Sequence, residues 1–367
     1  MFLNRLKFFL KRLKHRLLYV LKIGYLLIIK NSMKIIYIPV TKKIVERNFR
    51  NNLKCIFYDI YIVLKNFSFN KKINKNTSGY IDAAIHSNAY VLELPYNYCL
   101  IFSKILNLFF DGIFINWKFT NYRNDKEDLE KKLLKLSRIY NIKKVIVDAT
   151  DKSVNIIKED ILDGFDYVIK REKNRQISNK KYLTTMLSCT MVDYKISKKK
   201  EIINWNIIGK SEPNKKPTYD IFFSGKKTSK YRKELIEFLY SKEFNFFGRA
   251  EDTKIPFDQY LSAIYDSSIN LALEGKGEFT FRHLEILASC SFMLCPNSIN
   301  ELELPLPLVD GKHFVTFKNK DDLIEKINFY LKNNSLRNNI ALNGRKVLEE
   351  YYSPKKHGEF LFSKIFS

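Results

Sequence analysis

The chain has 367 residues, 46% of them hydrophobic, and a formal net charge of +25. This length and apolar content are enough for two domains, and they exclude a fibrous repeat or a mainly disordered chain. The five cysteines are scattered and include no CxxC pair, which disfavours a disulfide scaffold or a zinc site. Because such cysteines suit a reducing compartment, we expect a cytoplasmic protein.

The first 32 residues are a basic amphipathic segment. Residues 1–34 contain nine Lys or Arg and no acid. Leucines recur at helical spacing, at Leu3, Leu6, Leu10, Leu13 and Leu17. Such a helix can lie on an anionic membrane surface or pack on the protein itself, and both readings stay open. The apolar run 17–29 is interrupted by Lys22 and falls short of the roughly 20 residues that span a bilayer. Residues 1–32 are therefore expected to be an appendage, with peripheral attachment to the inner face of a membrane as one hypothesis.

Strands and helices alternate through the next part of the chain. Apolar runs predict strands at 34–40, 90–94, 113–116, 143–148 and 166–170, and amphipathic patterns predict helices at 125–139 and 154–162. Alternation of this kind is typical of a parallel sheet with helices on both faces. We expect an N-terminal Rossmann-like lobe over 33–210.

The same alternation starts again after a polar stretch, where we expect the domain junction at 200–216. Strands are predicted at 219–225, 244–248, 268–273, 291–295 and 313–317, and helices at 229–240, 257–265, 280–288, 321–332, 336–352 and 355–366. A second Rossmann-like lobe over 211–367 follows. The expected fold class is α/β, with two parallel sheets facing a cleft.

Ionisable side chains that suit a binding site are concentrated in segment 271–296. It contains three glutamates, an arginine and a histidine between two apolar runs. Thr280 is a suitable N-cap for the helix, and Arg282 and Glu285 share one of its faces. The loop after a parallel strand and the first turn of the next helix form the usual ligand crevice, and anions are favoured there.

From about Tyr219 to the C-terminus the chain resembles the nucleotide-binding lobe of GT-B glycosyltransferases, especially the CgeB-like and group 1 types. The resemblance is carried, in order, by Asp220–Gly225, Phe246–Gly248, Tyr260–Ile264 leading into Ser268–Leu273, Phe281–Ala288, Asp310–Phe317 and Asp321–Leu331. It implies transfer of a sugar from a nucleotide-sugar donor to a glycan or lipid-linked acceptor, as in surface polysaccharide or glycoconjugate biosynthesis, without a further cofactor.

The resemblance also implies roles for single residues. Glu285 would contact the nucleotide ribose, and Arg282 would meet the diphosphate. The first glutamate of the family's paired motif falls on Gly277, with Glu278 one residue later and Glu274 three earlier, so retaining and inverting chemistry both stay open. Further candidate donor contacts are Ser224, Gly225, Lys226, Arg249, Glu278 and His283.

An inverting enzyme needs a general base on the acceptor side. Asp148 and Asp151 follow a predicted strand, and His86 and Asp111 are further candidates, although each has a structural alternative. Neither a DxD in an apolar strand nor an HExxH motif is present, so we expect no metal, and neutralisation of the diphosphate by Arg, Lys and helix N-termini.

Three other functions stay open. The charge suits a nucleic-acid-binding protein, but beyond the first 34 residues it is spread evenly and no nucleic-acid motif is found, so we expect no nucleic-acid partner. A GT-B-like polyol-phosphate transferase would keep the fold and change the chemistry. A non-catalytic pair of lobes is the third alternative.

Overall fold

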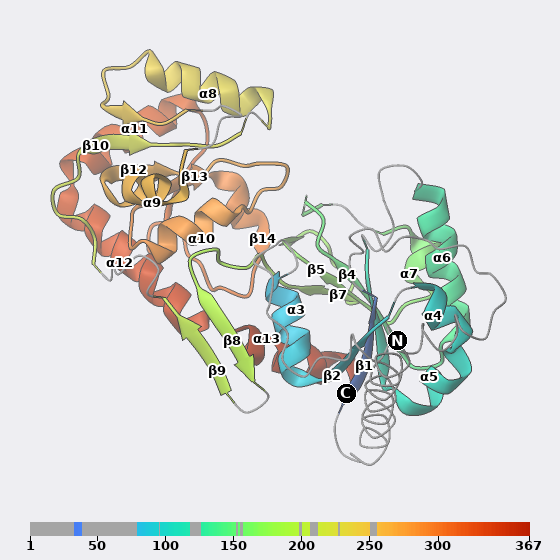
Figure 1. Cartoon of the computed structure of the whole chain (residues 1–367). Coiled ribbons are helices and arrows are strands. Elements are labelled where there is room, and N and C mark those ends of the chain that lie inside the picture. Colours follow the sequence, from blue (N-terminus) through green and yellow to red (C-terminus); the bar gives the residue numbers. More distant parts are fainter. Residues whose placement is uncertain are drawn as a thin grey trace, which may run out of the picture.

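Two α/β lobes lie side by side in the computed structural model (Figure 1). The structure describes residues 33–38, 79–94, 96–117, 126–151, 153–154, 157–197, 200–205, 212–226, 228–249 and 255–367. The basic segment 1–32, with its predicted helix, lies outside these residues. The architecture confirms the predicted α/β class with two Rossmann-like lobes.

The first lobe is built on a six-stranded parallel sheet in the order β2-β1-β3-β4-β5-β7. Its strands are β1 (Lys34–Ile38), β2 (Tyr90–Glu93), β3 (Gly112–Asn116), β4 (Lys143–Asp148), β5 (Tyr167–Lys170) and β7 (Tyr182–Thr184). Because β1 has β2 on one side and β3 on the other, the strand order reverses between β1 and β3. The carboxyl ends at such a reversal are where open α/β sheets bind ligands.

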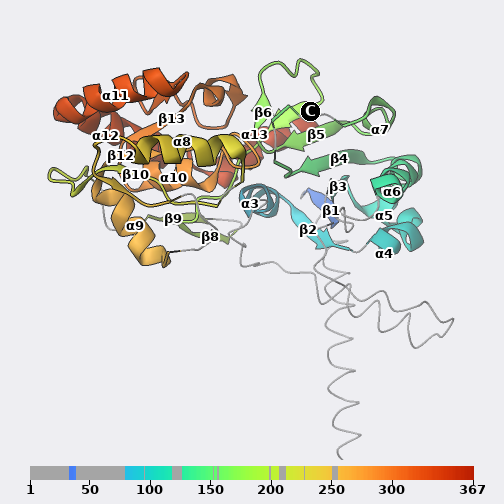
Figure 2. The same ribbon diagram turned by 90° about the horizontal axis from the view of Figure 1, so that it is seen from above.

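Side chains of each strand alternate between two cores. In β1, Ile36 and Ile38 pack with the helices of one face, and Ile35 and Tyr37 pack with those of the other. Helices α4 (Tyr96–Ile101), α5 (Ser103–Phe109), α6 (Lys126–Ile139) and α7 (Glu159–Leu162) cover the first face. Helix α3 (Gly79–Asn88) covers the second face and lies toward the other lobe (Figures 1 and 2).

The second lobe has a five-stranded parallel sheet in the order β11-β10-β12-β13-β15. Its strands are β10 (Tyr219–Phe222), β11 (Phe246–Phe247), β12 (Ser267–Leu271), β13 (Met293–Pro296) and β15 (Val315–Phe317). Its helices are α8 (Lys230–Tyr240), α9 (Phe257–Tyr265), α10 (Phe281–Ala288), α11 (Lys320–Lys332) and α12 (Asn334–Tyr351). The strand order reverses here between β10 and β12.

The predicted lobe boundaries need two corrections. Residues 186–192 supply Met186, Leu187 and Met191 to the core of the second lobe, so the chain leaves the first lobe before the expected junction at 200–216. The last helix, α13 (Pro354–Ile365), belongs by packing to the first lobe, because Leu361 and Ile365 join the core under α3. Apolar periodicity predicts a buried face, but not which lobe buries it.

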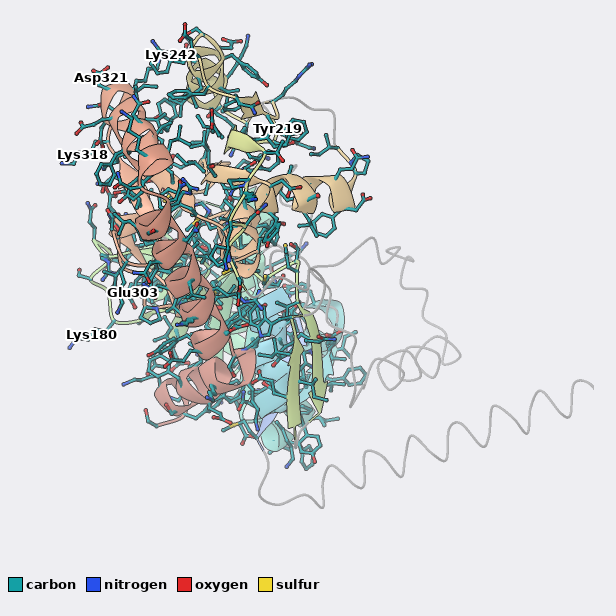
Figure 3. All side chains as sticks on the ribbon, turned by 90° about the vertical axis from the view of Figure 1, so that its left-hand side faces the viewer. Lys180, Tyr219, Lys242, Glu303, Lys318 and Asp321 are labelled. Atoms are coloured by element: carbon teal, nitrogen blue, oxygen red, sulfur yellow. The ribbon has the colours of Figure 1, made fainter. Side chains whose placement is uncertain are left out.

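Two short ladders supplement the main sheets. Strand β6 (Lys173–Asn174) of the first lobe pairs with β14 (Leu302–Glu303) of the second, which follows the 3-10 turn η1 (Asn297–Glu301). Strands β8 (Asp193–Ser197) and β9 (Lys200–Asn204) form a hairpin. Glu303 lies toward the first lobe, whereas Lys242, Lys318 and Asp321 mark the far end of the second (Figure 3). Within the described ranges, none of the helices has the length and apolar character to cross a membrane.

Candidate active site

Two arginines from different helices converge beside the turn that follows β10. Helix α8 is capped by the Ser229 hydroxyl, which accepts a hydrogen bond from the backbone N–H of Arg232 (3.2 Å) and fixes this arginine in the first turn. Arg282 lies in the first turn of α10. Their guanidinium carbons are 5.4 Å (Arg232) and 4.5 Å (Arg282) from the centroid of the Phe223 ring. Both cations therefore meet at one aromatic ring at the carboxyl edge of the second sheet.

Backbone carbonyls anchor the two guanidinium groups. Arg232 donates to the carbonyl of Lys226 (2.9 Å) after β10 and to that of Leu273 (2.9 Å) after β12, so it spans the point where the strand order reverses. Arg282 donates to the carbonyl of Ser224. The Nε–H groups of both arginines are buried and have no hydrogen-bond partner in the described part of the chain. An unsatisfied buried donor costs roughly 1–3 kcal/mol, which a ligand acceptor would recover.

The charge on this pair is only weakly compensated. Burial, together with the neighbouring charge of Arg282, lowers the pKa of Arg232 to about 10, and Glu274 opposes the shift. Neither arginine forms an ion pair with any described residue. Arg345, another buried arginine over an aromatic ring, does have a carboxylate partner, Glu349 at 2.7 Å. The arrangement of Arg232 and Arg282 thus favours an anion.

Glu285 is buried on α10 and already accepts two hydrogen bonds. Its Oε1 accepts from the hydroxyl of Thr190 (2.7 Å), and its Oε2 accepts from the hydroxyl of Tyr260 (2.8 Å). Burial raises the pKa of Tyr260, and the carboxylate of Glu285 adds to the rise, so the phenol stays a donor. Each carboxylate oxygen can accept one more bond. Glu285 is therefore oriented by two hydroxyl groups and retains acceptor capacity.

His283 is a structural residue in the described geometry. Its Nδ1 accepts a hydrogen bond from the backbone N–H of Thr280 (3.1 Å), and its ring stacks on Phe279. With the Thr280 hydroxyl it completes a capping box at the start of α10. Burial, then the charge of Arg282, lowers the pKa of His283 to about 3. The ring therefore stays neutral and caps the helix, and its contact to the donor stays a prediction.

The turn after β10 holds the other predicted donor contacts. A Cβ on Gly225 would lie 2.6 Å from a terminal nitrogen of Arg282, so the lack of a side chain lets that guanidinium pass beneath the turn. The backbone N–H of Gly225 donates to the carbonyl of Arg249 (3.1 Å), which brings Arg249 beside the turn. The side chains of Lys226 and Arg249 are exposed. Ser224, Gly225, Lys226, Arg249 and Arg282 are thus brought together.

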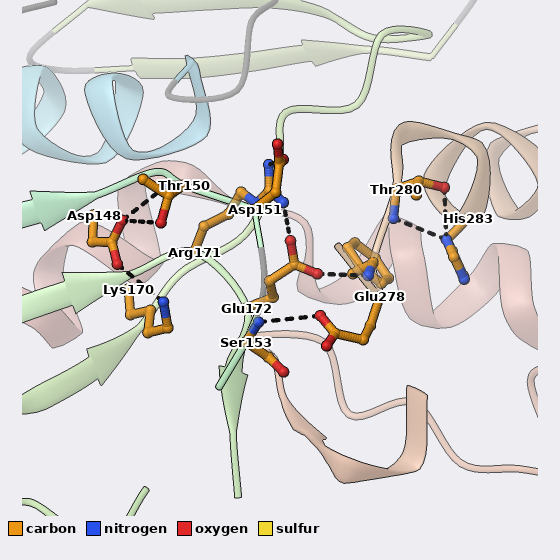
Figure 4. A network of polar contacts seen from close by, with 11 residues as sticks. Asp148, Thr150, Asp151, Ser153, Lys170, Arg171, Glu172, Glu278, Thr280 and His283 are labelled. Carbon is orange, nitrogen blue, oxygen red and sulfur yellow. Dashed lines mark hydrogen bonds and ion pairs between the residues drawn. The ribbon is translucent and has the colours of Figure 1, made fainter. Parts of the chain in front are cut away.

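In the first lobe, Asp148 is held in a buried ion pair. Its Oδ2 is 3.0 Å from Nζ of Lys170, and its Oδ1 accepts from the backbone N–H (2.9 Å) and the hydroxyl (2.5 Å) of Thr150 (Figure 4). Only 4% of Asp148 and 0% of Lys170 are exposed. So enclosed a carboxylate favours a structural role, and the role of Asp148 as a catalytic base stays a prediction.

Asp151 belongs to a network that joins the two lobes. Its Oδ1 is 2.9 Å from Nη1 of Arg171, which also pairs with Glu172. Glu172 in turn accepts from the backbone N–H of Phe279 in the second lobe (2.6 Å). In the opposite direction, Glu278 accepts from the backbone N–H of Ser153 (3.1 Å) (Figure 4). Glu278, predicted as a donor contact, therefore bridges the lobes, while the side chain of Asp151 stays 36% exposed.

His86 lies near the strand reversal of the first sheet. Its Nε2 is 3.3 Å from Oε1 of Glu93, the last residue of β2. Nearby, the hydroxyl of Tyr37 in β1 donates to Asp82 of α3 (2.7 Å). Burial, then the charge of Asp82, raises the pKa of this phenol. Asp111 lies at the opposite edge of the sheet, where it accepts from the backbone N–H of Lys34 (2.6 Å). His86, Asp82 and Glu93 therefore lie at the edge of the sheet where a ligand is expected, and Asp111 does not.

The lobe that carries Arg232 and Arg282 matches a known family in sequence. Residues 229–362 match the model of a family described as glycosyl transferase-like. Over these residues the C-terminal lobe is similar to that family. This match confirms the predicted resemblance of that part of the chain to glycosyltransferases. A search of curated proteins finds no match.

Solved glycosyltransferase structures are similar at low identity. T4 phage BGT, in complex with UDP-glucose, has 12% identity and a TM-score of 0.46, with 91% of this chain and 99% of that chain covered. HepE from Anabaena, in complex with UDP and glucose, has 10% identity and a TM-score of 0.46, with the same coverage. A glycosyltransferase from Rickettsia africae ESF-5 has 10% identity and a TM-score of 0.49, with 92% and 99% covered.

This glycosyltransferase-like lobe has Gly277 where its relatives are expected to carry the first glutamate. A Cβ at Gly277 would lie 2.6 Å from Oε1 of Glu172, so a carboxylate of the first lobe occupies the space that a side chain would need. The contact between the lobes therefore accounts for the glycine. Glu278, the neighbouring acid, is turned toward Ser153.

Sequence reasoning missed Arg232, Glu93 and Asp82 as site residues. Arg232 is one cation among several in the segment Lys226–Lys233, and its capped position after a strand and a glycine turn was the available signal. Asp82 and His86 are four residues apart on one helix, which places both on one face. Glu93 had no signal beyond its place at the end of a predicted strand.

Proposed function

We propose that the chain transfers a glycosyl group from a nucleoside diphosphate sugar to the hydroxyl of a glycan or lipid-linked acceptor, without a metal. One observation carries the donor part of this proposal: the buried Arg232 and the half-buried Arg282 meet at Phe223, each with a buried, unpartnered Nε–H and with no ion pair in the described residues. A diphosphate supplies both the acceptor oxygens and the negative charge that this pair lacks.

The arginines would act most strongly as the donor bond breaks. When the sugar leaves, negative charge grows on the diphosphate oxygens, and fixed cations in a water-poor site stabilise that charge better than they stabilise the bound donor. Arg282 also sits in the first turn of α10, where the helix dipole favours an anion. A pair of guanidinium groups can therefore take the role that a divalent cation has in other transferases.

Glu285 is the group that we propose for the nucleotide ribose. The Thr190 and Tyr260 hydroxyls hold its carboxylate in one orientation, and its free acceptor positions suit two neighbouring ribose hydroxyls. Thr190 belongs to the segment that connects the lobes, so the orientation of Glu285 depends on how the lobes are docked. The proposal predicts that Glu285→Gln weakens the binding of nucleosides and of nucleotides to the same extent.

Two residues suit the general base that an inverting reaction requires. Nε2 of His86 lies 3.3 Å from the Glu93 carboxylate without a hydrogen bond to it, and the other ring nitrogen can accept a proton. Asp151 is partly exposed where the lobes meet, but its ion pair with Arg171 favours a structural role. We propose His86 as the base. His86→Gln should then reduce kcat while Asp151→Asn retains it.

A thermal-shift screen of the full chain tests the donor assignment. The panel contains UDP-, GDP-, CMP- and dTDP-sugars, together with a CDP-linked polyol that tests the polyol-phosphate alternative. A ligand at 100 times its Kd stabilises the folded protein by about 2.7 kcal/mol. Arg232→Gln and Arg282→Gln should each weaken the responding nucleotide by roughly ten- to a hundred-fold, because a charge-assisted hydrogen bond is worth about 1.5–3 kcal/mol.

Arg345→Gln is the matched control, since Arg345 is also buried over an aromatic ring but lies away from the turn. It should leave nucleotide affinity unchanged. The donor assignment is wrong if no member of the panel raises the melting temperature, or if the three variants bind the responding nucleotide equally well.

A further inference from the structure

The outer flank of the first lobe carries a cluster of exposed apolar side chains. Leu108 is 77% exposed, Ile105 55%, Ile101 54% and Phe109 44%. All four lie on α4 and α5, at the end of the molecule farthest from the second lobe (Figures 1 and 2). Single exposed apolar residues are common on protein surfaces, but a contiguous group of large ones marks an interaction surface.

The spacing of these residues makes them one face. Leu108 and Phe109 follow Ile105 by three and four residues on α5, and Ile101 is the last residue of α4, just before α5 begins. Leu106, the next residue on α5, is buried in the core of the lobe. Helix α5 therefore has two apolar faces, and the core covers only one. We call Ile101, Ile105, Leu108 and Phe109 the flank patch.

The basic N-terminal segment joins the fold beside this patch. Phe109 is followed after one residue by Asp111, which accepts from the backbone N–H of Lys34 (2.6 Å) and donates its own N–H to the Lys34 carbonyl (2.9 Å). The described chain therefore begins, at Met33, beside the residues that follow the patch. Residues 1–32 carry eight of the nine cations of the region 1–34 and no acid.

The surroundings of the patch on the fold are also basic. Lys104 is exposed on α5 itself. The amide of Asn107 donates to the carbonyl of Ile139 (2.9 Å), which packs α5 against the last turns of α6, where Lys135 and Arg138 are exposed. Asp111 is an acid near this edge, and its carboxylate is bonded to the Lys34 backbone.

We infer that the flank patch docks on an anionic lipid bilayer, together with the basic segment 1–32. An apolar face with a basic rim matches the two layers of such a surface, acyl chains below and anionic headgroups above. The alternative occupant is the leucine stripe of residues 1–32. Packing it on the patch would bring its cations close to Lys104, Lys135 and Arg138, and this repulsion between like charges favours the bilayer.

This surface is independent of the donor site. The arginine pair lies in the second lobe, and the His86 region lies at the strand reversal, whereas the patch lies on the outer helices of the first lobe. A bilayer bound there leaves the junction between the lobes uncovered. If the proposed function holds, docking places the enzyme where lipid-linked acceptors are concentrated, but the docking itself does not rest on that function.

Vesicle sedimentation of the full chain tests the inference. Binding to phosphatidylglycerol vesicles is expected, with much weaker binding to phosphatidylcholine vesicles and a steep loss as salt is raised. The double variant Ile105→Ser/Leu108→Ser should bind phosphatidylglycerol vesicles roughly tenfold more weakly or worse, because two side chains no longer insert. Phe329→Ser/Leu336→Ser is the matched control, since both residues are exposed on helices of the second lobe. It should bind as the unmodified chain does.

Three results would overturn the inference. The first is no binding of the unmodified chain to phosphatidylglycerol vesicles, and the second is equal binding by the patch and control variants. The third is a melting temperature several degrees lower for the patch variant than for the control, which would show that the chain itself covers the patch. The nucleotide-induced thermal shift, measured in the same samples, should persist in both variants, so a failure here is distinguishable from failure of the donor site.

Discussion

The buried pair formed by Asp148 and Lys170 gives the sharpest test of the site. Both side chains are enclosed at the carboxyl edge of the first sheet, and the Lys170 ammonium is 3.0 Å from the Asp148 carboxylate. Asp148→Asn keeps the size of the side chain and can still accept from Thr150, but it leaves the buried ammonium without its counter-charge. The variant therefore isolates the charge of Asp148.

The expected cost follows from the burial. Removing one partner of a buried ion pair destabilises a protein by about 3–5 kcal/mol, since the remaining charge stays out of water. For a lobe of this size each kcal/mol lowers the melting temperature by about 2–4 °C, so a fall of roughly 6–20 °C is expected. Removing both charges, in Asp148→Asn/Lys170→Met, should cost less than the sum of the two single changes, because no unpaired charge remains.

Thermal unfolding and turnover would be measured on the two single variants and the double variant. We expect the double variant to lose less melting temperature than the two single variants lose together. Below the unfolding range, turnover should persist in Asp148→Asn, because the Asp148 carboxylate of the unmodified chain is not accessible to an acceptor. An unchanged melting temperature combined with a hundred-fold loss of turnover would refute this reasoning and restore Asp148 as a catalytic residue.

Three further predictions concern the junction and the donor turn. The pKa of His283 is about 3 in the folded state and near 6.5 in the unfolded state, so between these values the unfolded state binds one more proton. The free energy of unfolding, measured with urea, should therefore fall by about 2 kcal/mol from pH 6.5 to pH 5 on account of His283. The variant His283→Gln should lack this part of the pH dependence. Gly225→Ala should displace the Arg282 side chain and weaken nucleotide binding about tenfold in a titration, with a loss of stability of no more than about 1 kcal/mol; an unchanged Kd would contradict the close approach of that guanidinium. Gly277→Ala should push Glu172 away from the Phe279 N–H and increase proteolysis of the 273–279 loop. The control is Gly311→Ala, whose Cβ would meet no atom within 4 Å but whose φ is positive, so this variant has backbone strain without a close contact. Equal cleavage of the two variants would count against the contact between Gly277 and Glu172.

The strands were predictable because burial on both faces of a parallel sheet leaves long apolar runs. The runs at 143–148 and 219–225 contain β4 and β10, and the helix from 257 to 265 was predicted to the residue. Strands of two or three residues leave no such signal. Examples are β6, β14 and β7. Their residues are fixed by a partner far away in sequence.

Site residues were predictable where local chemistry decides their place, and not where a distant partner does. Arg282 follows a helix cap, so its place at the edge of the sheet could be read from the sequence. The pairing of Asp148 with Lys170 and the turn of Glu278 toward Ser153 depend on contacts 22 and 125 residues away. The capping role of His283 was not specified in advance, because a histidine at the third position of a helix can cap it as a glutamate does.

Helix α13 has a consequence for how the chain is made. It covers the same face of the first sheet as α3, to which it is joined by the bond from the Asn88 amide to the Lys355 carbonyl (3.1 Å), yet it is translated after the whole of the second lobe. On the ribosome the first sheet must wait, with Phe114 and Ile35 uncovered on that face, until residues 354–365 emerge. The first lobe is therefore completed only after the second has been synthesised, so the lobes do not become complete in the order in which they are translated.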